Sequence, residues 1–525
     1  MWKKLRCIGL ALALAISFAG EVGAQTKGGK LMIGRPTDAI SLDSNAETTG
    51  AGSIVYWNII EPLIYVAQDG QIKPKLATEY QLVSPDRIRF KLRKGIQFHD
   101  GTPFNAAAVK FTFDRAADDK QPARWKALFG PLKGAEVVDE YTVDVLTTVP
   151  YAPIIASSAM CYTGIVSPAA VQKFGDAYGR NPVGTGPFKF KEWQAKNFIS
   201  IVRNDDYWGE KAYLDEVVFK VIPEGGARMM GLKAGDLDMV VQPVPSELPG
   251  FRKDPKFTLA ETIGGRIIYV GFNMGLAPTN DPKVRQALSM AVNVPAIVEN
   301  IMEGAAVPAK GYLAPSVFGF KDMELSKRFP FDLKKAKSLL AEAGWKPGPD
   351  GILAKDGQKL TIKFLGAKAR FPMDAEICEA VQAQWKELGV DVKLEFFDWA
   401  TTFGLVRKPE LPYNSFMMGW VTTNNDADYS LYAMFHSSQI PPKGWNSNAF
   451  KDSSVDLLLD EARVSPDRNK RIENYAKVQN VLADAAAWIP IYNTKEVFVL
   501  NKKVKGFVPE AIEYQLTLGN VWLEK

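Results

Sequence analysis

The sequence has 525 residues, of which 46% are hydrophobic, 11% aromatic and 23% charged. A chain of this length exceeds what one hydrophobic core supports, so two or more lobes are expected. The formal net charge of +5 is small and no basic stripe runs through the chain, which argues against nucleic acid as a partner.

The first 24 residues have the pattern of a cleavable secretory signal. A charged start, MWKKLR, precedes the apolar run CIGLALALAISFAG, and Val22 and Ala24 suit the −3 and −1 positions of a signal peptidase site. The apolar run of about 14 residues falls short of the roughly 20 that a membrane-spanning helix needs. We therefore expect cleavage after Ala24 and export to the periplasm.

Two cysteines, Cys161 and Cys378, would remain in the mature chain. An oxidising compartment permits a bridge between them, whereas two separate buried thiols are the simpler interpretation. The sequence leaves both alternatives open.

The first half of the chain alternates strand-like and helix-like segments. GGKLMIGRPTDAISLDSN predicts a short strand that runs into a polar loop, and SIVYWNIIEPLIY is apolar at helical spacing. Ile88, Phe90 and Leu92 alternate as in a half-buried strand, and a helix is expected to start near Asn105. AEVVDEYTVDVLT predicts a hairpin, and FISIVRN and VVFKVIP predict two more strands.

Helices with clear start and stop signals begin near residue 272. Asp281 is the expected N-cap of one helix, with Pro282 at its first position. Asp332 is the expected N-cap of another helix, which Gly344 ends.

A strand, a helix and a second strand follow one another after residue 359. KLTIKFLG and VDVKLEFF alternate apolar and polar residues, and the helix between them ends at Gly389. This βαβ order predicts a partly parallel sheet, which binds ligands at the carboxyl ends of its strands. One more strand, SFMMGW, leads into GWVTTNNDADYSLYAMFHSS, residues 419–438, at the place where such a ligand would lie.

No catalytic or metal-binding motif is present. The chain lacks a G-x-S-x-G elbow, a phosphate loop with G-K-S or G-K-T, and H-E-x-x-H. His99, His436 and the two cysteines lack metal-ligand spacing, and Asp426 and Asp428 have the positions of loop caps. We therefore expect no enzyme activity, no metal and no cofactor.

Half a dozen motifs in order carry a resemblance to a known family. They are YWNIIEPLIY, LATEYQLVSPDRIRFKLRKGIQFHDGTPFNAAAVKFTFDR, NPVGTGPFKFKEW, NDDYWG, FNMGLAPTNDPKVRQALSMAVN and the GW segment. Over nearly the whole mature chain the sequence resembles solute-binding protein family 5 of ABC importers, which includes dipeptide- and oligopeptide-binding proteins.

The resemblance implies an α/β fold with two lobes, the periplasmic-binding-protein fold, with an extra subdomain and two hinge crossings. The first lobe would comprise residues 25–272 and 492–525, with the subdomain at about 62–182, and the second lobe residues 273–491. A monomer would enclose a small polar ligand between its lobes and deliver it to the membrane permease of an ABC importer. The alternative is an exported ligand-sensing or chaperone-like protein of the same fold.

Family positions carried over to the GW segment predict one wall of the ligand site. Trp420 is the candidate wall, the alternative being a core tryptophan under the sheet, and Thr422 and Thr423 offer hydroxyl groups beside it. Peptide-binding members place a carboxylate at the position of Thr423, where it holds the α-ammonium of the ligand. Asp426 could substitute if the loop folds differently. Because a buried ammonium without a counter-charge is costly, an ordinary free-amine dipeptide is disfavoured.

Other candidates come from the loop before the helix that ends at Gly389 and from the first lobe. Arg370 could receive a carboxylate or phosphate with two hydrogen bonds, and Lys368 could assist as a point charge. Thr48 matches a pocket-lining threonine of the dipeptide binders, and Tyr162 could reach the ligand from the subdomain. The ligand class stays open among peptide-like, opine-like, glutathione-like and sugar-conjugate compounds.

Overall fold

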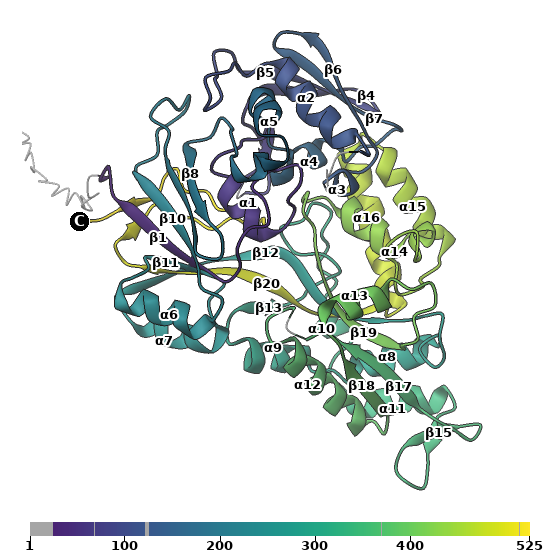
Figure 1. The fold of residues 1–525 in the computed structure, drawn as a ribbon. Helices are drawn as coiled ribbons and strands as arrows, with labels where there is room; N and C mark the ends of the chain where they lie inside the picture. Colours follow the sequence, from purple (N-terminus) through teal and green to yellow (C-terminus); the bar gives the residue numbers. More distant parts are fainter. Residues whose placement is uncertain (1–24, 68, 121–124, 369, 514) are drawn as a thin grey trace, which may run out of the picture.

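The computed structural model describes residues 25–67, 69–120, 125–368, 370–513 and 515–525. The expected signal peptide, residues 1–24, lies outside the described residues. Figure 1 shows a mixed sheet that runs through the molecule, with helices along it and a smaller antiparallel sheet at one end.

The large sheet has the strand order β18-β17-β19-β12-β20-β11-β1-β10-β9-β8, and β13 pairs with β20. Its strands are β1 (Lys30–Arg35), β8 (Phe188–Gln194), β9 (Phe198–Arg203), β10 (Glu216–Val221), β11 (Met239–Val241), β12 (Phe257–Phe272), β13 (Ala306–Pro308), β17 (Thr361–Gly366), β18 (Asp391–Phe396), β19 (Ser415–Val421) and β20 (Trp488–Asn501). The predicted strands in KLMIGR, FISIVRN and VVFKVIP are confirmed as β1, β9 and β10.

The smaller sheet forms part of the N-terminal half and has the order β4-β5-β7-β6. The strands of the small sheets are β2 (Ile64–Val66), β3 (Ile72–Pro74), β4 (Ala77–Ser84), β5 (Arg87–Leu92), β6 (Leu132–Asp139), β7 (Thr142–Thr147), β14 (Lys346–Pro347), β15 (Leu353–Lys355), β16 (Gln358–Lys359), β21 (Val504–Lys505) and β22 (Trp522–Leu523). The predicted strand at Ile88 is β5, and the predicted hairpin is the antiparallel pair β6 and β7.

Side-chain caps start several of the helices. The helices are α1 (Gly50–Tyr56), α2 (Ala106–Ala117), α3 (Lys126–Phe129), α4 (Ile154–Ser158), α5 (Pro168–Phe174), α6 (Gly225–Ala234), α7 (Leu248–Lys253), α8 (Pro282–Met290), α9 (Val294–Met302), α10 (Leu325–Arg328), α11 (Leu333–Glu342), α12 (Asp374–Glu387), α13 (Trp399–Val406), α14 (Ala427–Phe435), α15 (Ser453–Val464) and α16 (Arg468–Asp484). The predicted helix start near Asn105 and the predicted caps Asp281 and Asp332 are confirmed, because each of these side chains accepts a backbone N–H of the first turn.

Helix α1 is shorter than the apolar run that predicts it. It ends at Tyr56, and the chain then turns and continues as β2. The carbonyl groups of Asn58 and Ile59 accept hydrogen bonds from Phe188 and Gly186, at 3.1 and 2.9 Å. These long-range hydrogen bonds occupy carbonyl groups that a longer helix would have used itself.

The predicted βαβ unit is confirmed. Strands β17 and β18 are parallel from Thr361 opposite Asp391 to Gly366 opposite Phe396, with α12 between them in the chain. Strand β19 is parallel to β17 on its other side, so the GW segment begins at the carboxyl end of a strand in this sheet.

The two longest strands, β12 and β20, belong to different hydrophobic cores at their two ends. Near one end, Val497 and Val499 of β20 pack in a cluster with residues of α6 and α7. At the other end, Ile489 and Ile491 pack with residues of α8, α12 and β17. The pairing of β12 with β20 is irregular between Ile263 and Ile267, where the strands pass from one set of cores to the other.

Both cysteines of the described chain are free thiols in buried positions. Burial raises the pKa of both Cys161 and Cys378, which makes the thiols unreactive. The structure therefore supports two separate thiols and not a bridge. In the part of the chain that the structure describes, no helix combines the length and the apolar character needed to cross a membrane.

Candidate functional site

Strand β19 ends at the GW segment, and Trp420 and Thr422 are anchored there by one serine. The indole N–H of Trp420 donates to Ser430 Oγ at 3.1 Å, and the Thr422 hydroxyl lies 2.6 Å from the same oxygen. Trp420 is half-buried and Thr422 is buried. The polar atoms of both side chains are thus engaged by α14, while the ring of Trp420 stays partly accessible.

Asp426 belongs to a structural network at the start of α14. Its side chain accepts the backbone N–H of Asp428 at 3.0 Å and pairs with Arg471 at 2.6 Å. Arg471 also donates to the Tyr475 hydroxyl at 2.8 Å. Because Asp426 has these partners and its side chain is only 4% exposed, it acts here as a helix cap and buried ion-pair partner.

The GW segment contacts the part of the chain around α4. The Thr423 hydroxyl donates to the Met160 sulfur at 3.7 Å, and the Asn424 amide donates to Ser157 Oγ at 3.4 Å. The Tyr151 hydroxyl lies 3.4 Å from Asp428 Oδ2. Segments about 270 residues apart therefore meet at the segment that carries Thr423.

Thr48 and Tyr162, the residues predicted from the first lobe, lie near the segment around α4 that the GW segment contacts. Tyr162, two residues after Met160, is fully buried, and its hydroxyl donates to the Thr48 carbonyl at 3.1 Å. Asn45 donates to the Thr112 carbonyl at 3.2 Å and is buried. The structure thus brings Thr48 and Tyr162 together and places them next to the residues that touch Thr423.

Six aromatic rings form an unbroken row through Trp420, which we call the aromatic row. Consecutive ring centroids lie 5.4 to 5.7 Å apart. The row consists of Phe371, Trp399, Phe403, Trp445, Trp420 and Tyr429. Apart from the buried Phe371, its members are half-buried, so the row presents ring faces and edges that a ligand could contact.

Two arginines lie over the aromatic row. The guanidinium of Arg370 is 5.2 Å from the ring centroids of both Phe371 and Trp399, and that of Arg407 is 4.0 Å from the centroid of Trp445. Arg370 and Lys368 are exposed on the loop before α12. The row therefore combines apolar ring surface with positive charge.

Asp374 holds the loop that carries Arg370. Its carboxylate accepts the backbone N–H groups of Arg370 and Phe371, both at 2.9 Å, and the side chain is buried. These hydrogen bonds fix the backbone beside the aromatic row, and with it the position from which the Arg370 side chain extends.

A charged group lies where β12 and β20 are irregularly paired. Arg266 donates to Glu513 at 2.9 and 3.0 Å, and its guanidinium is 5.9 Å from the ring of Phe371. Burial raises the pKa of Glu496 well above its usual range, the charge of Glu513 raises it further, and Arg266 opposes both effects. This group connects the C-terminal segment to the strands that join the cores.

Sequence reasoning missed several of these residues. Trp399 and Phe403 follow a strand in the aromatic run FFDWATTF, which could have signalled them. Arg407, Glu496 and Glu513 carry no local signal, because their partners lie on other segments.

Neither histidine takes part in the aromatic row or the charged group. His99 Nε2 lies 2.9 Å from the Gly186 carbonyl, and burial lowers the pKa of His99 to about 4. His436 accepts the backbone N–H of Ser438 at 3.1 Å. Across the described ranges, no three His, Cys, Asp or Glu side chains gather in a group that could hold a metal ion.

The sequence matches one family description over most of its length. Residues 71–442 match the family model described as bacterial extracellular solute-binding proteins, family 5 Middle.

Individual proteins are similar over nearly the whole chain. The heme-binding protein A of Haemophilus influenzae is 32% identical over 85% of this chain and 84% of its own length. The dipeptide-binding protein of Escherichia coli is 30% identical over 84% of both chains. Among solved structures, the ABC transporter-associated periplasmic binding protein DppA from Helicobacter pylori, in complex with the peptide STSA, matches with a TM-score of 0.75. It is 28% identical and covers 95% of this chain and 99% of its own.

Proposed function

This chain belongs to family 5 of the bacterial extracellular solute-binding proteins, and we propose that it captures a small ligand that carries an anionic group beside an apolar or flat body. It acts as the solute-binding receptor of an ABC importer. The relatives are binding proteins, and binding without bond cleavage is proposed for this chain as well.

The observation that supports this ligand class is the aromatic row with its two arginines. Half-buried rings favour a flat or apolar ligand body, and the guanidinium of Arg370 suits a carboxylate or phosphate with two parallel hydrogen bonds. Lys368 on the same loop adds positive charge. The anion would bind Arg370 while the body lies along the rings of Trp399 and Trp420.

The same surface lacks what a free-amine peptide needs. At the position where peptide-binding relatives are expected to carry an acid, Thr423 is neutral and contacts the Met160 sulfur. Of the nearby carboxylates, Asp426 pairs with Arg471. Asp428 contacts Tyr151 through Oδ2, and Oδ1 has no hydrogen-bond partner in the described chain. Burial raises the pKa of Asp428, which disfavours the charged form that an ammonium group would need. A ligand with a blocked or absent amine therefore fits this surface better than a free dipeptide.

Ligand capture would involve two lobes, residues 25–272 with 492–525 and residues 273–491. The contact of Thr423 and Asn424 with the segment around α4 joins these parts of the chain, and β12 and β20 connect them. A ligand that touches both lobes would favour the closed arrangement, which would then bind the permease. We propose export to the periplasm by cleavage after Ala24, and action as a monomer.

Native mass spectrometry of the purified protein tests the ligand class directly, because a tightly bound ligand would be released with its own mass. A compound with a carboxylate or phosphate and no free α-amine supports the proposal. A free-amine peptide as the bound compound would contradict it.

Substitution of Arg370 tests the anchor. Arg370→Ala is expected to weaken binding of the identified ligand at least about tenfold in calorimetry. Arg180→Ala is the matched control, since Arg180 is also an exposed arginine over a tryptophan, 3.4 Å from the ring of Trp193, in the first-lobe part of the chain. Equal affinities of the two variants would overturn the assignment of Arg370.

A further inference from the structure

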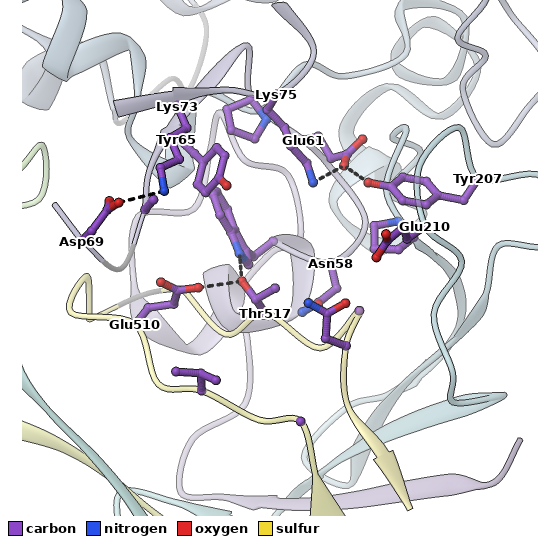
Figure 2. Close-up of a pocket in the computed structure, with 18 residues that line it drawn as sticks. Asn58, Glu61, Tyr65, Asp69, Lys73, Lys75, Tyr207, Glu210, Glu510 and Thr517 are labelled. Carbon is purple, nitrogen blue, oxygen red and sulfur yellow. Dashed lines mark hydrogen bonds and ion pairs between the residues drawn. The ribbon is translucent and has the colours of Figure 1, made fainter. Parts of the chain in front are cut away.

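A cavity of about 560 Å³ lies away from the aromatic row. Its walls come from three parts of the chain. The lining residues are Trp57, Asn58, Glu61, Pro62, Tyr65, Ala67, Asp69, Lys73, Lys75, Pro187, Tyr207, Glu210, Gly506, Val508, Glu510, Thr517, Gly519 and Asn520. Figure 2 shows Glu510 and Glu210 on opposite sides of this cavity. No residue of the proposed second lobe, 273–491, is among the lining residues, so this site is separate from the one proposed above. Its volume is in the range of small-molecule sites.

One wall of the cavity is held rigid by Glu61. This buried carboxylate accepts hydrogen bonds from Thr185 at 2.8 Å, Tyr207 at 2.6 Å and Trp208 at 2.8 Å, and Lys75 Nζ lies 3.1 Å away. Because the groups around Glu61 satisfy one another, this wall is formed before any ligand arrives.

The lysines of the cavity are already neutralised. Lys75 pairs with Glu61, and Lys73 pairs with Asp69 at 2.8 Å, as Figure 2 shows. Neither Glu210 nor Glu510 has an ion-pair partner among the described residues. The lining therefore offers two carboxylates that no protein cation neutralises, which favours a cationic ligand over an anion.

Glu510 is the more informative of these two carboxylates. Its residue is only 9% exposed, and one oxygen, Oε1, accepts a hydrogen bond from Thr517 at 3.1 Å. The second oxygen has no hydrogen-bond partner in the described chain. Burial raises the pKa of Glu510, against the hydrogen bond from Thr517. A cation beside this carboxylate would offset the cost of burying its charge.

Aromatic side chains flank the same space. Trp57 and Tyr65 line the cavity, and the indole N–H of Trp57 donates to the Thr517 hydroxyl at 3.0 Å. The hydroxyl in turn donates to Glu510, so the indole, the hydroxyl and the carboxylate form one chain of hydrogen bonds. Aromatic faces next to carboxylates suit ammonium groups that carry an alkyl chain.

We propose that this cavity is a second binding site, which takes a small aliphatic diamine with one ammonium group on Glu510 and the other facing Glu210. The ammonium on Glu510 binds the carboxylate oxygen that has no protein donor. The alkyl chain lies against Trp57 and Tyr65, and the exposed carboxylate of Glu210 attracts the far end. The site does not depend on the ligand proposed for the aromatic row.

Calorimetric titration with 1,5-diaminopentane tests the site, with 1,5-pentanediol as the neutral probe of the same length. We expect saturable binding of the diamine at millimolar concentration or below, and none of the diol. Glu510→Gln is expected to weaken diamine binding at least about tenfold, because a charge-assisted contact is lost. Glu473→Gln, at an exposed position on α16, is the control for the loss of one negative charge outside the cavity.

A second variant tests the orientation of the ligand and does not depend on the folding of the first. Glu210→Gln, an exposed position, is expected to weaken binding of the diamine by about twofold to threefold and to leave pentylamine binding unchanged. The indole N–H signal of Trp57 in an NMR spectrum, assigned with Trp57→Phe, should shift on addition of diamine to the unmodified protein.

Four outcomes would overturn the proposal. They are the absence of saturable diamine binding, equal binding by Glu510→Gln, equal binding of the diol, and displacement of the diamine by calcium chloride, which would indicate a site for inorganic cations. The proposal would also be overturned if Arg370→Ala lost diamine binding while Glu510→Gln retained it, because this result would place the diamine at the aromatic row. Because the proposed function is tested at Arg370, its failure can be told apart from failure here.

Discussion

Substitution of Asp426 separates a structural role in the GW segment from a ligand-binding role. Asp426→Asn keeps a side chain that caps helices about as well as aspartate but removes the charge opposite Arg471. The side chain of Asp426 is 4% exposed and that of Arg471 is 8% exposed. Removing one member of a buried ion pair typically costs about 3 to 5 kcal/mol, because it leaves the other charge uncompensated.

The structure sets the expected cost near the lower end of that range. Without the aspartate, Arg471 still donates to the Tyr475 hydroxyl at 2.8 Å and to the Ala462 carbonyl at 3.1 Å. We therefore expect Asp426→Asn to lower the free energy of unfolding by about 3 kcal/mol. Asp426→Ala should cost about 1 kcal/mol more, since it also removes the cap of α14.

Urea unfolding followed by circular dichroism measures these differences. The double variant Asp426→Asn with Arg471→Met should recover part of the loss, because it removes the uncompensated charge as well. A loss below about 1 kcal/mol in Asp426→Asn, together with lost ligand binding, would refute the structural role and favour Asp426 as a ligand residue. A double variant as unstable as the single one would refute the ion-pair reasoning.

Two further predictions concern Thr423 and Glu496. Thr423→Asp should enable the protein to bind free-amine dipeptides, which calorimetry with such a dipeptide measures. Tight dipeptide binding by the unmodified protein would show that the neutral Thr423 side chain does not prevent it. Because the pKa of Glu496 is raised in the folded state, the folded chain binds more protons, so the contribution of Glu496 to stability falls as pH rises above about 4. Glu496→Gln should remove this pH dependence of the free energy of unfolding. Urea unfolding should therefore show the variant becoming more stable relative to the unmodified protein between about pH 5 and about pH 8. A constant difference in the free energy of unfolding at the two pH values would contradict this role of Glu496.

The parts of the fold that the sequence predicts are those set by nearby residues. Asn105, Asp281 and Asp332 each bond to a backbone N–H within three positions of themselves, so their effect is visible in a short window. The alternation that predicts β5, β17 and β18 is equally local. The apolar run around Asn58 predicts a longer helix than α1, because the pairing of its carbonyl groups with Gly186 and Phe188 of a distant segment is not visible in the run itself.

The unpredicted parts of the sites depend on contacts between distant segments. Glu510 reaches Trp57 through Thr517, and 460 residues separate Trp57 from Thr517, so no spacing rule connects them. The aromatic row draws on four separate stretches of chain, of which only the Trp420 segment and the Arg370 loop were singled out. Family resemblance indicates the GW segment through its motif and the Arg370 loop through its place before the helix that ends at Gly389, whereas Arg407 and Trp445 are revealed only by the packing.

The GW segment shows how much of a polar sequence can be used by the fold itself. Asp426 is paired with Arg471, Asp428 contacts Tyr151, and Thr422 contacts a serine of the following helix. Because Asp426 and Thr422 are engaged within the protein, a ligand at this end of β19 gains little from these two side chains. The ring surface of the aromatic row and the positive charge of the exposed Arg370 lie beside this segment. They are the reason why we propose an anionic ligand with a flat or apolar body, which the carboxylates of the segment alone would not indicate.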